Sequence, residues 1–170
     1  MIACLDVQYD NHQAAAAAMV LDSWRASLPF AQYSTLVQGI GEYEPGKFYL
    51  RELRPLLSVM DMIAESIDTL VIDAYCFLDA DLSPGLGARL YESLPRHPII
   101  IGVAKNRYRD TRHAQEVFRG GSKKPLFVTS IGLSPQDAAS HIESMIGDFR
   151  IPTLLKLVDR LARDTLLQAK

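Results

Sequence analysis

Two short segments of this chain contain almost no polar residue, and they constrain its fold more than any other feature. Residues 70–73 read LVID and residues 98–104 read PIIIGVA. A strand that is apolar at successive positions is covered on both faces, which is typical of a central strand in a parallel sheet. Helices must then lie on both sides of that sheet, so the sequence predicts an α/β fold.

The first forty residues predict three strands before any helix. Residues 2–8 and 31–38 are strand-like, and residues 14–22 form an alanine-rich segment between them. Alanine favours helix. The shortness of the segment and the turn residues at 9–12 nevertheless favour a hairpin. Three strands followed by alternating helices and strands predict a mixed sheet with helices on both faces.

Helical spacing begins after Glu52. Apolar residues recur there at Leu53, Leu56, Leu57, Met60 and Ile63. This stripe predicts a helix with Pro55 in its first turn, where proline is tolerated. Further helices are expected at 86–94, at 134–146 with Ser134 as the N-cap, and after residue 152. Residues 126–130 predict a strand, and residues 105–124 predict a polar loop or short hairpin.

Length and composition predict one domain spanning residues 1–170. The chain is 48% hydrophobic and 22% charged, with a net charge of −2 at pH 7. Positive charge for a nucleic acid must then be local. Cys4 and Cys76 lie in apolar stretches and predict buried free thiols in a reducing compartment. No leader is recognisable, and the apolar run 14–21 is too short to span a bilayer, so a cytoplasmic protein without membrane contact is expected.

Three carboxylates stand at the edges of apolar segments: Asp6, Glu52 and Asp73. An acid in such a position loses solvation and needs a cation, hydrogen-bond donors or a proton. Oxygen ligands suit Mg²⁺, which is completed by waters and substrate phosphates. The trio therefore predicts a divalent-metal site. Alternatively, Asp6 and Asp73 bond to turn amides, and Glu52 is a helix N-terminal charge favoured by the dipole.

Five strings around these acids occur in a fixed order. They are LDVQY with Asp6, YEPG from Tyr43, LRE ending at Glu52, VID ending at Asp73, and IGVAK ending at Lys105. In this order the chain resembles the endonuclease V family, metal-dependent nucleases that recognise deaminated adenine (inosine) in DNA or RNA. A weaker match follows in KPLFV at 124–128, FRIP at 149–152 and Asp159.

The resemblance implies a fold, a cofactor and roles for single residues. It implies a ribonuclease H-like mixed β-sheet, with Asp6, Glu52 and Asp73 holding Mg²⁺ (or Mn²⁺) and acting in catalysis. Lys105 would lie close to the cleaved phosphate as a further catalytic group. Tyr43, with Pro45 and Gly46, would be the wedge that holds strands apart while the altered base is extruded.

Basic residues gather between positions 105 and 124. Lys105, Arg107, Lys123 and Lys124 are expected to bind the nucleic-acid backbone together with Arg109, Arg112 and Arg119. The function expected from the resemblance is a divergent, Mg-dependent endonuclease that hydrolyses phosphodiester bonds near deaminated bases in DNA or RNA. Its oligomeric state is not predicted by the sequence.

The chain also departs from the family pattern. The family usually has Gly-His-Gly after its third acid, whereas this chain has Ala74-Tyr75-Cys76-Phe77. The family's active-site histidine falls near residues 130–133, which contain no imidazole. The alternative function is therefore a non-catalytic nucleic-acid-binding or partner protein that keeps the fold. A third is another metal-dependent phosphotransfer reaction.

Overall fold

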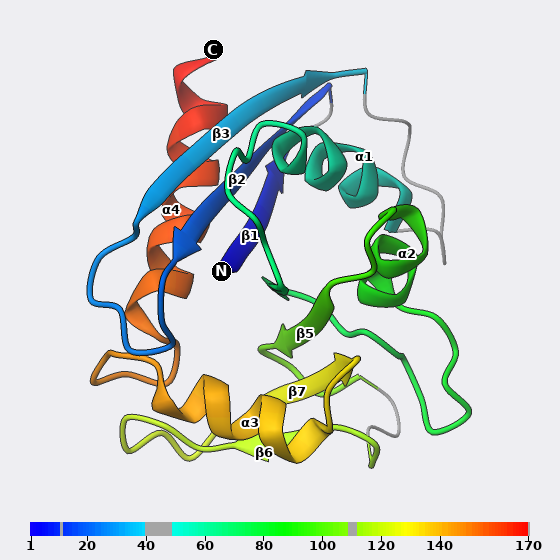
Figure 1. Cartoon of the computed structure of the whole chain (residues 1–170), viewed down its shortest axis with the longest axis vertical. Coiled ribbons are helices and arrows are strands. Elements are labelled where there is room, and N and C mark those ends of the chain that lie inside the picture. The colour runs from blue at the N-terminus through cyan, green and yellow to red at the C-terminus, as the bar shows by residue number, and fades with distance from the viewer. Residues whose placement is uncertain (11, 40–48, 109–111, 170) are drawn as a thin grey trace.

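The computed structural model describes residues 1–10, 12–39, 49–108 and 112–169, and it shows one sheet with helices on either side (Figure 1). The elements, in chain order, are β1 (Ile2–Tyr9), β2 (Gln13–Leu21), β3 (Ala31–Gln38), α1 (Tyr49–Met60), β4 (Thr69–Ile72), α2 (Leu86–Ser93), β5 (Ile99–Ala104), β6 (Gln115–Val117), β7 (Leu126–Ile131), α3 (Pro135–Ser144) and α4 (Thr153–Gln168). The seven strands lie in the order β3-β2-β1-β4-β5-β7-β6. This confirms the predicted order of elements.

The centre of the sheet is parallel and its two sides are antiparallel. Strands β1, β4 and β5 run in parallel, while β2 and β3 continue one side and β7 and β6 the other as antiparallel neighbours. The two apolar runs at residues 70–73 and 98–104 thus supply strands β4 and β5. The polar segment 105–124, expected as a loop or short hairpin, contains β6, and β6 pairs with β7, which lies beyond that segment.

Tertiary packing decides the conformation of the alanine-rich segment. All nine residues of β2 are buried between β1 and β3. Ala17 packs in the core on one face of the sheet, and Ala14, Ala16 and Ala18 pack in the core on the other. Burial and ladder pairing outweigh the helix propensity of alanine, which amounts to less than about 1 kcal/mol per residue.

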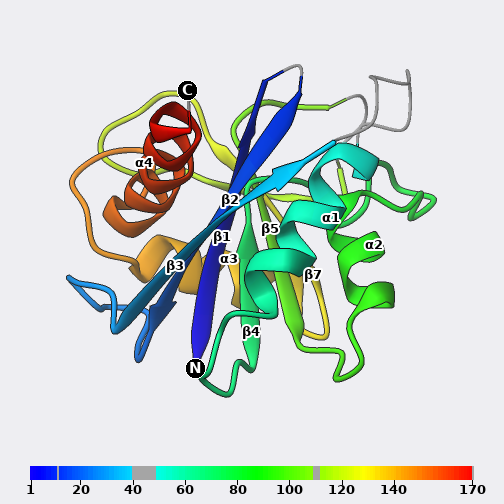
Figure 2. The ribbon, with the colours of Figure 1, turned by 90° about the horizontal axis from the view of Figure 1, so that it is seen from above.

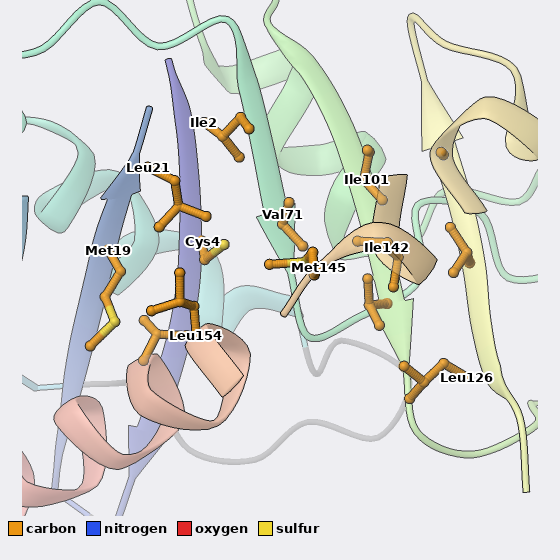
Figure 3. Packing of buried hydrophobic residues seen from close by; sticks show 14 of the residues in the cluster. Ile2, Cys4, Met19, Leu21, Val71, Ile101, Leu126, Ile142, Met145 and Leu154 are labelled. Carbon is orange, nitrogen blue, oxygen red and sulfur yellow. The ribbon is translucent and has the colours of Figure 1, made fainter. Parts of the chain in front are cut away.

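Each face of the sheet carries its own core. Seen along the sheet, α3 and α4 lie on one side, and α1 and α2 lie on the other (Figure 2). In the first core, Leu154 of α4 and Ile142 of α3 pack against side chains of the central strands, including Cys4, Val71 and Ile101 (Figure 3). This confirms the mixed sheet with helices on both faces. Both cysteines are free and buried.

The start of helix α1 differs from the prediction, and α2 and α3 end at Ser93 and Ser144, slightly before their predicted ends. Helix α1 starts at Tyr49, three positions before Glu52, so Pro55 lies inside the helix and not in its first turn. The helix extends because Tyr49 is partly buried against the core beneath α1. The Ser134 cap is confirmed, since its Oγ accepts a hydrogen bond of 3.1 Å from the amide of Asp137. In the described segments, no helix combines the length and the apolar character needed to cross a bilayer.

Candidate active site

Two neighbouring parallel strands bring Asp6 and Asp73 together. Leu5 of β1 pairs with Ile72 of β4, so the residues that follow them lie side by side on strands about 5 Å apart. Side chains alternate between faces along a strand. Because Leu5 and Ile72 belong to the core beneath α1, Asp6 and Asp73 point to the other face, towards α4.

Lys105 follows the end of β5 and contacts this pair. Its ammonium Nζ donates a hydrogen bond to Oδ2 of Asp73. Burial disfavours the charged ammonium, but the hydrogen bond and charge of Asp73, with the charges of Asp6 and Asp159, outweigh it and raise the pKa of Lys105. Lys105 therefore remains protonated and serves as a fixed positive charge rather than as a base.

A fourth acid, Asp159, reaches the same place from α4. Nε2 of Gln8 lies 3.0 Å from Oδ1 of Asp159 and 3.4 Å from Oδ2 of Asp6, so one amide bridges the two carboxylates. The other oxygen of Asp159 accepts a hydrogen bond of 2.8 Å from Nη2 of Arg163. In the sequence, Asp159 belongs only to the weaker match to the family. The signal that could have pointed to it is its position next to Val158, which is buried on the apolar side of α4.

Glu52 lies in the first turn of α1, whose core is on the opposite face, yet it interacts with the same acids. Burial, followed by the charges of Asp6 and Asp73, raises the pKa of Glu52 to about 8. Burial, followed by the charges of Asp73 and Asp159, raises the pKa of Asp6 to about 7. Mutual repulsion of this kind requires that the carboxylates share one low-dielectric region.

A cavity of about 20 Å³ opens onto this group of acids. Asp6, Asp73 and Lys105 give its polar lining, and its apolar lining consists of Leu5, Ile72, Val103, Leu126, Ile151, Leu155 and Val158. A volume of this size holds about one water molecule. We call Asp6, Glu52, Asp73 and Asp159, together with Lys105, the acid cluster.

The donor chemistry of the acid cluster fits a hard divalent cation, because all four acids offer oxygen. The arrangement is not closed around such an ion. Among the described residues, no three carboxylate, imidazole or thiol side chains are placed so that they could hold a metal ion. The ammonium of Lys105 contacts Asp73 instead. A bound cation would have to take the place of that ammonium on Asp73.

The structure describes only some of the predicted nucleic-acid contacts, and for those other than Arg119 nucleic-acid binding stays a prediction. Tyr43, Pro45 and Gly46 fall outside the described residues, as does Arg109. The guanidinium of Arg107 pairs with Glu116 and lies 5.4 Å from the ring centre of Phe127. Lys123, Lys124 and Arg112 have exposed side chains.

Arg119 does not join the predicted basic surface. It is 8% exposed, and its guanidinium donates to the backbone carbonyl of Glu143 near the end of α3 and to those of Met145, Gly147, Phe149 and Arg150 in the turn between α3 and α4. Its hydrogen-bond donors are used inside the protein and are unavailable to a phosphate. The prediction for Arg119 is therefore wrong.

The turn at residues 130–133 lies far from the acid cluster. A Cβ on Gly132 would lie 3.4 Å from Cγ1 of Ile99, the first residue of β5, whereas Lys105 follows the last residue of that strand. Six residues of strand span about 20 Å. A side chain in this turn cannot reach the acids, so the prediction that an active-site position falls there is wrong. On the α4 side of the sheet, the residue that completes the acid cluster is Asp159 of α4.

The seven-stranded mixed sheet, with Asp6 on β1 and Asp73 just past the end of the adjacent β4, defines a ribonuclease H-like α/β fold. Comparison with known families gives a match over residues 1–134 to the family described as endonuclease V. The chain therefore belongs to the endonuclease V family. Among curated proteins, no sequence matches it.

Solved structures of endonuclease V agree with this assignment. The chain is 26% identical to endonuclease V from Streptomyces avermitilis, with a TM-score of 0.76 over 99% of this chain and 82% of that one. It is 17% identical to Ciona intestinalis endonuclease V, with a TM-score of 0.81 over 99% of this chain and 86% of the other. That structure is a complex with a 23mer DNA containing an inosine followed by a ribo-adenosine. Endonuclease V from Bacillus subtilis is 16% identical, with a TM-score of 0.77 over 99% and 82% of the two chains.

Proposed function

We propose that this protein is a metal-dependent endonuclease that hydrolyses phosphodiester bonds near deaminated bases, above all inosine, in DNA or RNA. The observation that carries the proposal is that Asp6 of β1 lies beside Asp73, just past the end of the adjacent parallel strand β4, with Lys105 on Asp73. Family membership, and the inosine-containing DNA bound by the Ciona relative, support the choice of substrate.

Asp6, Glu52 and Asp73 would hold Mg²⁺ or Mn²⁺. Asp159 is linked to Asp6 by the side-chain amide of Gln8, which donates a hydrogen bond to both carboxylates. Such an ion, when bound, lowers the pKa of a water and stabilises charge on the leaving oxygen. The contribution of the protein's own residues is first the exchange of protons for the cation at two carboxyl groups. Asp6, with a pKa raised to about 7, and Glu52, with a pKa raised to about 8, release their protons when they become ligands.

The positively charged ammonium of Lys105 interacts with the cleaved phosphate. Its raised pKa keeps the ammonium protonated, and Lys105 lines the cavity together with Asp6 and Asp73. A fixed donor at such a position stabilises the extra negative charge of the transition state more than that of the ground state. Substrate binding would use Arg107, Lys123 and Lys124 along the backbone, with Tyr43, Pro45 and Gly46 as the wedge.

The test is nicking of labelled DNA and RNA strands that contain a single inosine, with Mg²⁺ or Mn²⁺. Nicking beside the inosine is expected for the wild type, and Asp6→Asn and Asp73→Asn are expected to lose it. The matched control is Asp61→Asn, an exposed carboxylate just beyond the far end of α1, which should nick at the wild-type rate. Wild-type protein that leaves every strand intact with both ions would remove the proposal.

The second candidate function is non-catalytic binding of nucleic acid or of a partner. It is favoured by the positions of three histidines, whose imidazoles make contacts outside the acid cluster and so do not replace the family's active-site histidine. His97 Nδ1 is 3.0 Å from the Tyr91 carbonyl, and His113 Nε2 is 2.8 Å from the Phe77 carbonyl. The ring of His141 stacks on that of Trp24. Binding of the inosine-containing strands without nicking, with an affinity that Asp73→Asn leaves unchanged, would establish the binding function in place of the nuclease.

A further inference from the structure

Phe149 presents a large apolar ring to solvent in the turn between α3 and α4. The residue is 65% exposed, and two other apolar residues of this region, Phe118 and Ile146, are 54% and 42% exposed. Apolar side chains gathered at the surface often mark a binding site. An aromatic ring in particular offers a flat surface on which a nucleic-acid base can stack.

The backbone that carries this ring is held firmly. Arg119 donates to the carbonyl of Phe149 at 3.0 Å and to that of Gly147 at 3.3 Å. Gly120 packs so closely beneath the turn that a Cβ there would lie 2.5 Å from Cα of Phe149. The buried guanidinium and this close approach fix the backbone of the turn, so the position from which the exposed ring projects is set before any ligand arrives.

The turn is joined directly to the acid cluster. Nη2 of Arg150 donates to the backbone carbonyl of Lys105 and, at 2.7 Å, to that of Pro125. Ile151 lines the cavity beside Asp6 and Asp73. Phe149 is therefore next in sequence to the residue that holds the backbone of Lys105, and it stands two positions before a residue that lines the cavity of the proposed active site.

The charge around Phe149 suits a polyanion. The ammonium of Lys156 lies 4.1 Å from the centre of the ring. Lys123 and Lys124, both exposed, precede Pro125, whose carbonyl is bonded to Arg150. Asp148 is the acidic neighbour in the turn, and it is outnumbered by these lysines. An aromatic ring beside ammonium groups is the pairing that binds base and phosphate of one strand.

We propose that Phe149 is a stacking platform for a base of the substrate strand near the cleaved phosphate, with Lys156 binding the phosphate that follows. The platform rests on the proposed function, because it places the strand at the rim of the acid cluster. It takes unpaired DNA or RNA of any sequence, since every base has a π face. It adds a subsite on the Lys105 side of the acid cluster.

A tryptophan introduced at this position reports stacking directly. The chain has one tryptophan, so the double variant Trp24→Phe, Phe149→Trp carries a single indole. Single-stranded oligonucleotides, with and without inosine, are titrated in EDTA so that no cleavage is needed. Saturable quenching of the indole emission is expected. The control is Trp24→Phe, Phe30→Trp, because Phe30 is 64% exposed and lies in the connection between β2 and β3.

Affinity provides a second measurement. Phe149→Leu is expected to weaken binding of the single strand about tenfold, a typical effect of losing one base stack, while Phe149→Tyr and Phe30→Leu keep wild-type affinity. The platform is overturned if position 149 shows no quenching, if position 30 is quenched equally, or if Phe149→Leu binds as tightly as the wild type. Quenching in a protein that never nicks would instead leave the platform standing while the proposed nuclease fails.

Discussion

The side-chain amide of Gln8 donates to Oδ1 of Asp159 across 3.0 Å, and this hydrogen bond joins the first strand to the last helix. The same nitrogen lies 3.4 Å from Asp6. A neutral amide satisfies lone pairs of two carboxylates but cancels no charge. Lys105 offsets the charge of Asp73, but the remaining carboxylates of the acid cluster still repel one another, and a cation relieves this repulsion more than any neutral donor can.

Replacing this amide with an acid should sensitise the protein to cations. Gln8→Glu adds a carboxylate beside Asp6 and Asp159 and removes the donor, so the melting temperature in EDTA is expected to fall below that of the wild type. The rise on adding Mn²⁺ should be larger than in the wild type. Thermal unfolding by circular dichroism measures both. Gln32→Glu, at an exposed position on β3, is the control, and equal Mn²⁺ responses in the two variants would contradict the expectation.

Stability without metal should fall as pH rises. The pKa of Asp6 is raised from 3.8 to about 7 and that of Glu52 from 4.5 to about 8. Between these limits the folded state binds more protons than the unfolded state. Stability from this source is therefore present below about pH 4 and is lost as pH rises through 7 and 8. Each pKa unit corresponds to about 1.4 kcal/mol.

Urea unfolding in EDTA at pH 5, 6.5 and 8 measures this slope. Asp6→Asn removes one of the two titrating groups and part of the repulsion on Glu52, so its stability should vary less with pH. Saturating Mn²⁺ should reverse the wild-type trend, because cation binding favours the deprotonated carboxylates. A wild-type slope equal to that of Asp6→Asn would show that the raised pKa of Asp6 is not coupled to folding.

Removal of Lys105 should separate a structural effect from a chemical one. Its pair with Asp73 is about one third exposed on either side, so Lys105→Met is expected to lower stability in EDTA by at most about 1 kcal/mol. Nicking, if the proposed function holds, should fall by about 100-fold or more, as for a lost transition-state donor. Arg96→Met, an exposed cation elsewhere, is the control for both readouts.

Arg119 is predicted to stabilise the protein rather than to bind nucleic acid. Arg119→Met would leave buried carbonyls of the turn between α3 and α4 without their donor, at a cost of about 1–3 kcal/mol for each unsatisfied group. Gly120→Ala should destabilise the same turn, because its φ is +58° and a Cβ would meet the Asp148 carbonyl at 2.4 Å. Urea unfolding measures both. Wild-type stability of Arg119→Met would contradict this role.

Much of the fold follows from local patterns in the sequence. The apolar runs of β4 and β5 require cover on both faces, and the stripe from Leu53 onward requires a helix, since burial of apolar surface depends on spacing that can be read along the chain. The alanine-rich β2 was predictable as a strand only through its polar turn and short length. The strings around Asp6, Glu52, Asp73 and Lys105 also carry the family, because each motif is local.

The sequence by itself determined the order of elements, the family and the identity of three acids. Only the tertiary structure decided which groups share the site. It brought Asp159 to Asp6 from more than 150 positions away, bound Lys105 to Asp73, buried Arg119 in the turn between α3 and α4, and placed the 130–133 turn at the far end of β5. The reason is physical: spacing encodes which face is buried, whereas contacts between distant side chains depend on how helices cross the sheet and on local charge.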